Sequence, residues 1–151
     1  MSELKNRIRQ DLSAAMKARD DVRKGALRML VSAITYEERS GSQHELSDEE
    51  ILGIVAREIK KRRESADIYA QNDRPDLAER EEAEAAVLAE YQPSQFSDEE
   101  LSAFVAEVVQ EVAGENPTMK NMGPVMKAAQ ARAAGRVDGK RLSTAVRAAL
   151  S

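Results

Sequence analysis

Apolar residues recur along the chain at intervals of three and four, the spacing that places side chains on one face of an α-helix. The first segment shows the pattern clearly, with Leu4, Ile8, Leu12 and Ala15 separated by charged and polar residues. The same pattern predicts helices over residues 2–19, 22–38, 48–71, 75–90, 98–113, 121–134 and 138–150. No convincing strand pattern interrupts them. The chain is therefore predicted to be all-α and multihelical.

The starts of two helices carry a capping box, in which a Ser hydroxyl and a Glu side chain three residues later each accept a backbone N–H. These boxes begin at Ser47 and Ser97. Pro75 suits the first position of another helix, where its missing N–H would have no helical partner anyway. The local chemistry thus predicts three of the helix starts.

Gln92-Pro93 is the best candidate for a domain boundary, because proline interrupts the helical pattern there. We expect two subdomains on its two sides. Residues 1–92 form an N-terminal helical bundle with a long helical hairpin, and residues 93–151 form a small three-helix C-terminal subdomain. Three short helices bury little apolar surface, so the second subdomain is expected to be marginally stable or to move as a unit.

Composition narrows the class of protein further. The chain is 42% hydrophobic, with three Tyr, two Phe and no Trp, so its core must be mainly aliphatic. The absence of Cys excludes disulfides, thiolate metal sites and a cysteine nucleophile. No apolar run resembles a signal peptide or a membrane span. We therefore expect a cytoplasmic protein that does not bind membranes.

One charged residue falls on an apolar face and needs a partner there. Helical spacing places Arg62 with Ile59 and Ala66 on the inward face of the third helix, and places Glu81 and Glu84 inward on the fourth. In an antiparallel hairpin that turns at Asp73, Arg62 and Glu84 lie at the same height. We expect Arg62 to pair with Glu84 or Glu81; the alternative is independent solvation of these charges.

Charge is distributed unevenly along the sequence. Residues 117–151 contain seven Lys or Arg and one acid, whereas the other 116 residues contain 16 basic and 26 acidic residues. Gly135 and Gly139 would let the backbone approach a ligand, and a helix N-terminus near Asp138 favours phosphate. The candidate nucleic-acid-binding residues in this tail are Lys120, Lys127, Arg136, Gly139, Lys140 and Arg141. A solvated basic face is the alternative.

A second basic surface lies on the outer face of the third helix, at Lys60, Lys61 and Arg63. Acidic neighbours such as Glu64 leave a solvated face as the alternative here as well. The tail lacks aromatic residues on which single-stranded bases could stack, so backbone contact with structured RNA is favoured over single strands.

No signature of catalysis, metal binding or cofactor binding is found. The segment from Gly135 to Arg141 approaches a phosphate-binding loop, but it has three residues between its glycines instead of four and Arg in place of Ser or Thr. His44 is the only histidine and lies in a polar loop. We assign no catalytic residue, no metal ligand and no cofactor.

Several stretches, taken together in order and spacing, carry a family resemblance. They are 57–62, Tyr69, 74–78, Glu81, Glu84, 91–93, 122–123, 125–126, Gly135 and 138–139. On these residues the chain resembles the YqeY family over essentially its whole length. That family is similar to the C-terminal tail of GatB, the tRNA-recognising subunit of the aspartyl/glutamyl-tRNA amidotransferase. Pro124 departs from the Lys or Arg often found after the Met-Gly pair, which removes one candidate phosphate contact.

The resemblance implies two helical subdomains and contact with tRNA, without the catalytic domain of the amidotransferase. The leading hypothesis is a non-catalytic module that binds tRNA or other structured RNA and assists an amidotransferase complex. Families of this kind are also described as carbon–nitrogen ligases with glutamine as the amide donor, which gives a second hypothesis. A third is a helical protein–protein adaptor that uses the acidic N-terminal part.

Overall fold

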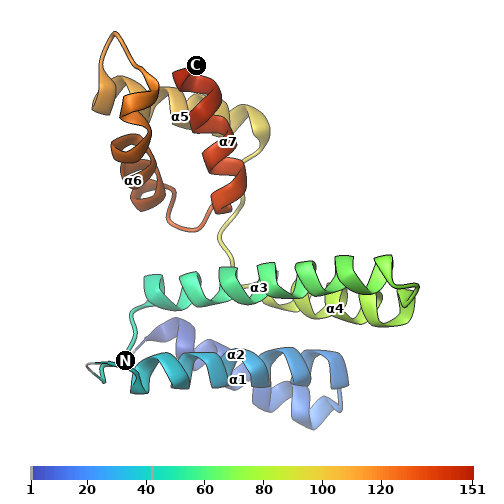
Figure 1. Ribbon diagram of the computed structural model, residues 1–151. Coiled ribbons are helices and arrows are strands. Elements are labelled where there is room, and N and C mark those ends of the chain that lie inside the picture. Colours follow the sequence, from blue (N-terminus) through green and yellow to red (C-terminus); the bar gives the residue numbers. More distant parts are fainter. Residues whose placement is uncertain (1, 42) are drawn as a thin grey trace. The chain divides into compact units, whose positions relative to one another are not determined.

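The computed structural model describes residues 2–41 and 43–151, and all regular structure among them is helical (Figure 1). The helices are α1 (Glu3–Ala18), α2 (Asp21–Arg39), α3 (Asp48–Gln71), α4 (Pro75–Ala89), α5 (Asp98–Ala113), the 3-10 helix η1 (Met119–Asn121), α6 (Met122–Ala133) and α7 (Gly139–Leu150). The prediction of an all-α protein is confirmed. None of the helices in these ranges is long and apolar enough to cross a bilayer.

The chain divides into two compact units, Met1–Gln92 and Pro93–Ser151. The division falls at the proline that interrupts the helical pattern. Shortly after this proline the backbone contacts a distant part of the second unit: the Phe96 N–H donates to the Arg136 carbonyl at 2.9 Å.

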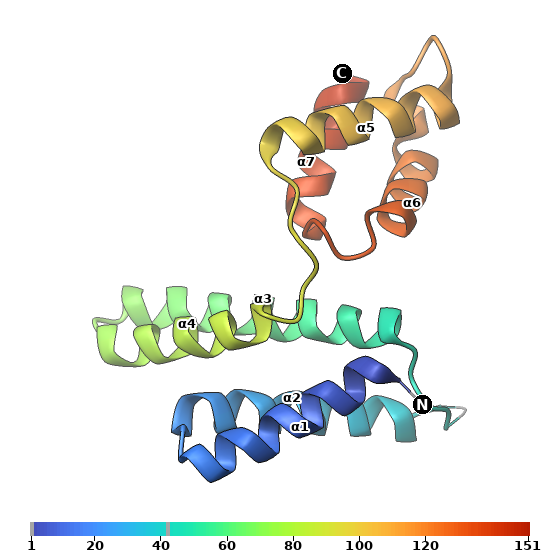
Figure 2. The ribbon, with the colours of Figure 1, turned by 180° about the vertical axis from the view of Figure 1, so that it is seen from behind.

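The N-terminal unit consists of two helical hairpins, α1–α2 and α3–α4, packed against each other (Figures 1 and 2). Its core is aliphatic, as the composition predicts, with Ile8, Leu30, Val55 and Leu88 fully buried. Tyr91 is the exception: its ring is buried while its hydroxyl donates to the Asp11 carboxylate at 2.6 Å. The hydrogen bond fixes the last residues of this unit to α1.

In the C-terminal unit, α5, α6 and α7 pack around a small core of Val105, Val108, Val125, Leu142 and Val146. Both capping boxes form, at Ser47 in the first unit and at Ser97 here. The local sequence therefore sets where α3 and α5 begin, and the start of α5 brings acidic residues close to the basic tail.

Candidate nucleic-acid interface

The basic tail folds against the acidic helix α5. Arg132 pairs with Glu111, Arg136 Nη2 lies 3.9 Å from Glu100, and Arg141 Nη2 lies 2.9 Å from Asp98. Residues 93–151 contain seven basic and seven acidic residues, so the C-terminal unit is neutral as a whole. The excess charge that is prominent in the sequence is largely compensated in the fold.

The turn at Gly135 to Arg141 is predicted to contact phosphate, but several of its hydrogen-bond donors are already bonded to groups of the protein. Arg136 Nε donates to the Ser94 carbonyl at 2.8 Å. Arg141 Nη2 donates to the Phe96 carbonyl at 3.1 Å as well as to Asp98. These two arginines hold the segment before α5 against the turn before α7.

The N-terminus of α7 already has an anionic cap. The Asp138 carboxylate accepts the backbone N–H of Arg141 at 2.7 Å. Gly139 is the first residue of α7, and a Cβ at this position would meet no atom within 4 Å. The backbone at Gly139 is therefore accessible, but a phosphate there would compete with the carboxylate of Asp138.

The lysines of the tail differ from these arginines. Lys120, Lys127 and Lys140 are exposed, and no ion pair to any of them occurs among the described residues. Lys140 lies near the acids that start α5, because it lines a groove with Asp98. Lys120 and Lys127 instead belong to η1 and α6, in a stretch without any acid between Glu115 and Asp138.

We define the α6 face as the exposed residues of η1 and α6. They are Met119, Lys120, Gly123, Pro124, Lys127, Gln130, Ala131 and Arg132. Arg132 at its edge is paired with Glu111, so Lys120 and Lys127 are its cations without a described acidic partner. Several of its side chains are small, which lets another backbone come close. The α6 face is therefore positively charged and open to a large ligand.

The second predicted basic surface is more strongly compensated. On α3, Lys60 lies 4.0 Å from Glu64 and Lys61 lies 3.8 Å from Glu58. Arg63 is exposed, and within residues 2–41 and 43–151 no ion pair is found for it. Of the three candidates here, Arg63 has the least compensated charge.

Arg62 is buried in the hairpin of α3 and α4 and contacts acidic side chains of both helices. Its side chain is 7% exposed, its Nε lies 3.4 Å from Glu84 Oε2, and its Nη1 donates to Glu58 Oε1 at 3.0 Å. The contact with Glu84 is an ion pair without a hydrogen bond, because Nε has no hydrogen-bond partner in the described part of the chain. Glu81, the alternative partner, is half-buried, and no described contact joins it to Arg62. Glu58 was not anticipated, although it stands four residues before Arg62 on the same helix.

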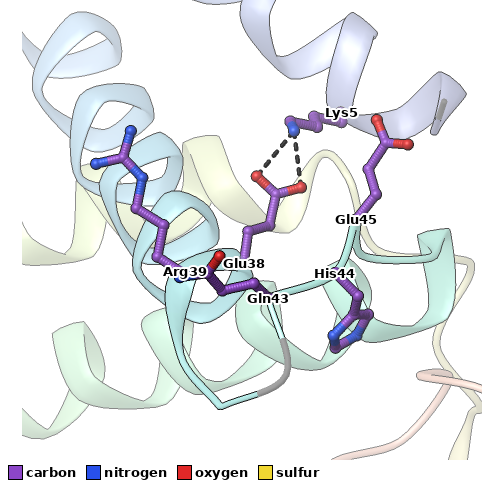
Figure 3. A pocket seen from close by; sticks show the side chains of 6 residues that line it. All are labelled: Lys5, Glu38, Arg39, Gln43, His44 and Glu45. Atoms are coloured by element: carbon purple, nitrogen blue, oxygen red, sulfur yellow. Dashed lines mark hydrogen bonds and ion pairs between the residues drawn. The ribbon is translucent and has the colours of Figure 1, made fainter.

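An open pocket in the N-terminal unit is lined by Lys5, Glu38, Arg39, Gln43, His44 and Glu45 (Figure 3). Lys5 Nζ donates to both oxygens of Glu38, at 2.8 and 2.7 Å, and this bond lowers the pKa of Glu38. His44 Nε2 lies 3.0 Å from Glu50, outside the pocket lining. Across the described residues, no group of three His, Cys, Asp or Glu side chains could hold a metal ion. The charges at the centre of this pocket are thus engaged with each other.

Comparison with known proteins identifies the family of this chain and several similar proteins. The family model described as Yqey-like protein matches residues 5–150, which confirms the resemblance seen in the sequence. Similar proteins include "Altered inheritance of mitochondria protein 41, mitochondrial" of Lachancea thermotolerans, 31% identical over 115 residues, or 75% of this chain and 62% of that protein. The protein of the same name in Meyerozyma guilliermondii is 32% identical over 127 residues, or 80% of this chain and 65% of that protein. The chain thus spans less than two thirds of the length of these two relatives.

The relatives correct one expectation. Their names call them mitochondrial, which contradicts the cytoplasmic location expected from the sequence. That expectation rested on the absence of Cys and of a long apolar run. Neither feature distinguishes one reducing compartment from another, so composition could not identify the location.

Proposed function

The chain belongs to the YqeY-like family, and from the geometry of its C-terminal unit we propose that it binds structured RNA, such as tRNA, without catalysing a reaction. The observation that carries the proposal is the α6 face, where exposed lysines occur in a stretch free of acids. Contacts between basic side chains and phosphate supply most of the sequence-independent affinity for nucleic acids.

Lys120 and Lys127 are the main phosphate contacts in this proposal. Neither has to break an ion pair among the described residues before it can bind a phosphate, unlike Arg132, which would have to leave Glu111. Gly123 and Pro124 lie between the two lysines and project little beyond the helix, which lets the sugar–phosphate backbone approach α6. Lys140 is a secondary contact, since it lines a groove together with Asp98.

The remaining predicted residues take different parts. Arg136 and Arg141 support the fold of the turn, and their charges are shared with Glu100 and Asp98. Lys60 and Lys61 are compensated by acids on their own helix, which leaves Arg63 as the residue of α3 best able to add to RNA affinity. Assistance to an amidotransferase complex would follow from RNA binding and needs no catalytic group in this chain.

The test is a titration of the full chain with tRNA at several salt concentrations. Affinity should fall steeply with salt, and each of Lys120→Ala and Lys127→Ala should reduce the slope of log K against log salt by about 0.9, the value expected for one duplex phosphate contact. Lys17→Ala is the matched control. Lys17 is an exposed lysine in the last turn of α1, and its substitution should leave the slope unchanged.

Two results would contradict the proposal. Absence of tRNA binding at low salt would leave the protein–protein adaptor as the better hypothesis. Release of ammonia from glutamine in the presence of charged tRNA would instead support a ligase and contradict the non-catalytic part of the proposal.

A further inference from the structure

Two stacked aromatic rings and a guanidinium group lie close together in the C-terminal unit. The rings of Phe96 and Phe104 are 4.9 Å apart between centroids, with an interplanar angle of 21°. The guanidinium carbon of Arg136 lies 4.1 Å from the centroid of the Phe96 ring. The Arg136 guanidinium therefore lies over the ring of Phe96, which is itself stacked on Phe104.

The position of the Arg136 side chain is fixed by hydrogen bonds of side chain and backbone. Its Nε donates to the Ser94 carbonyl at 2.8 Å, and its carbonyl accepts the Phe96 N–H at 2.9 Å. The turn before it depends on Gly135, whose φ of +85° is a conformation that other residues rarely adopt. The guanidinium is thus held in place before any ligand arrives.

The guanidinium also stays accessible to solvent. The Arg136 side chain is 38% exposed although its guanidinium carbon lies over the Phe96 ring. Its acidic neighbour Glu100 is 3.9 Å away, beyond hydrogen-bonding distance. A flat cation of this kind, supported from below by an aromatic ring, is a surface on which another planar π system can stack.

We propose that the free face of the Arg136 guanidinium stacks on an unpaired nucleobase of the bound RNA. Unstacked bases in loops and bulges are commonly recognised on aromatic rings or on arginine planes. The proposal rests on the RNA-binding function proposed above and makes it more specific, because the preferred RNA would carry an unpaired base beside a duplex that reaches the α6 face. In this proposal Arg136 stacks on a base with its planar guanidinium, and the lysines bind phosphates through their charge.

The experiment compares two RNAs of the same length and charge, a hairpin with 2-aminopurine in its unpaired loop and a blunt duplex. Each is titrated with the unaltered chain and with Arg136→Lys, which keeps the charge and removes the plane. Arg7→Lys is the control matched in chemistry, because the Arg7 guanidinium lies over the ring of Tyr91 at 4.8 Å in the N-terminal unit. Circular dichroism and thermal melting establish that each variant is folded.

We expect Arg136→Lys to weaken hairpin binding about 5- to 150-fold, the range that corresponds to loss of one contact between a base and an aromatic side chain, and to leave duplex binding unchanged. The change in 2-aminopurine fluorescence on binding should disappear with it. Arg7→Lys should affect neither RNA. The stacking proposal is wrong, and phosphate binding still stands, if Arg136→Lys weakens the binding of both RNAs equally or of neither. If Arg136→Lys unfolds the chain, Phe96→Leu takes its place as the test. A fluorescence change that remains intact in Phe96→Leu would then contradict stacking. If the unaltered chain binds neither RNA, the proposed function fails and the stacking proposal fails with it.

Discussion

Arg62 on α3 and Glu84 on α4 face each other across the helical hairpin, with 3.4 Å between Nε and Oε2. The pair stands within a largely buried group, since Glu58 also contacts Arg62 and the three side chains are 7%, 12% and 16% exposed for Arg62, Glu58 and Glu84. A buried cation between two carboxylates compensates both of them. Its removal leaves two largely buried carboxylates without the cation that lies between them.

We therefore expect Arg62→Ala to lower the free energy of unfolding of the N-terminal unit by about 3–5 kcal/mol. Urea denaturation monitored by circular dichroism measures the change. Arg80→Ala is the control, because Arg80 pairs with the same Glu84 at 3.5 Å but its side chain is 56% exposed, so its loss should cost about 1 kcal/mol or less. Equal effects of the two variants would show that the Arg62 pair behaves as a surface pair.

Gly53 occupies an exposed position in α3 where no steric reason requires glycine. A Cβ there would meet no atom within 4 Å. Because alanine loses less backbone entropy than glycine in a helix, Gly53→Ala should stabilise the protein by about 0.5–1 kcal/mol. Gly114→Ala is the opposing control: the site is equally open, but its φ of +72° disfavours any residue with a Cβ, so this variant should destabilise. Stabilisation by both, in the same urea titration, would contradict the conformational argument.

Tyr91 should resist ionisation. Burial of the ring, and then the hydrogen bond to Asp11, raise the pKa of its hydroxyl above the ordinary value. A folded-state pKa that is raised favours the neutral form, so this contribution to stability is complete below about pH 10 and is lost as the pH rises further. Absorbance at 295 nm should show one of the three tyrosines ionising only as the protein unfolds in alkali. Tyr91→Phe should abolish that late step, whereas Tyr36→Phe, which removes the hydroxyl of a 73% exposed tyrosine, should leave it in place.

His44 and Glu50 provide a test at acid pH. The pKa of Glu50 is lowered mainly by the hydrogen bond from His44, followed by the backbone N–H of Ser47. A lowered folded-state pKa contributes stability above the ordinary pKa of Glu, and this contribution is lost as the pH falls through the lowered value. His44→Ala should therefore raise the pKa of Glu50, as measured by NMR titration of side-chain carboxyl resonances. An unchanged Glu50 titration, with Glu38 as the internal reference, would show that Ser47 alone sets its pKa.

The sequence predicted best those features that depend on neighbours along the chain. The capping boxes at Ser47 and Ser97 involve residues three apart, and counting from the hairpin turn brings Arg62 level with Glu84. In contrast, Arg141 and Asp98 are separated by 43 residues, and nothing local shows that they meet. The sequence of the tail therefore shows its basic residues without their acidic partners, which lie in another helix.

The aromatic stack was missed for a related reason. The basic tail contains no aromatic residue, whereas Phe96 and Phe104 precede it and reach Arg136 only through the packing of the unit. A sequence signal did exist, since both phenylalanines of the chain lie within nine residues of each other, next to the Ser97 cap. Proximity to Arg136 still required the fold.

The equal numbers of acidic and basic residues in the C-terminal unit have a consequence for the kinetics of binding. At separations beyond the Debye length of about 10 Å in 0.1 M salt, a unit without net charge exerts little attraction on a polyanion, and the chain as a whole carries a net charge of −4. Encounter with RNA should then proceed without long-range steering, at about 10⁵–10⁶ M⁻¹ s⁻¹. The lysines of the α6 face act only after contact, so the salt dependence of affinity should reside mainly in the dissociation rate.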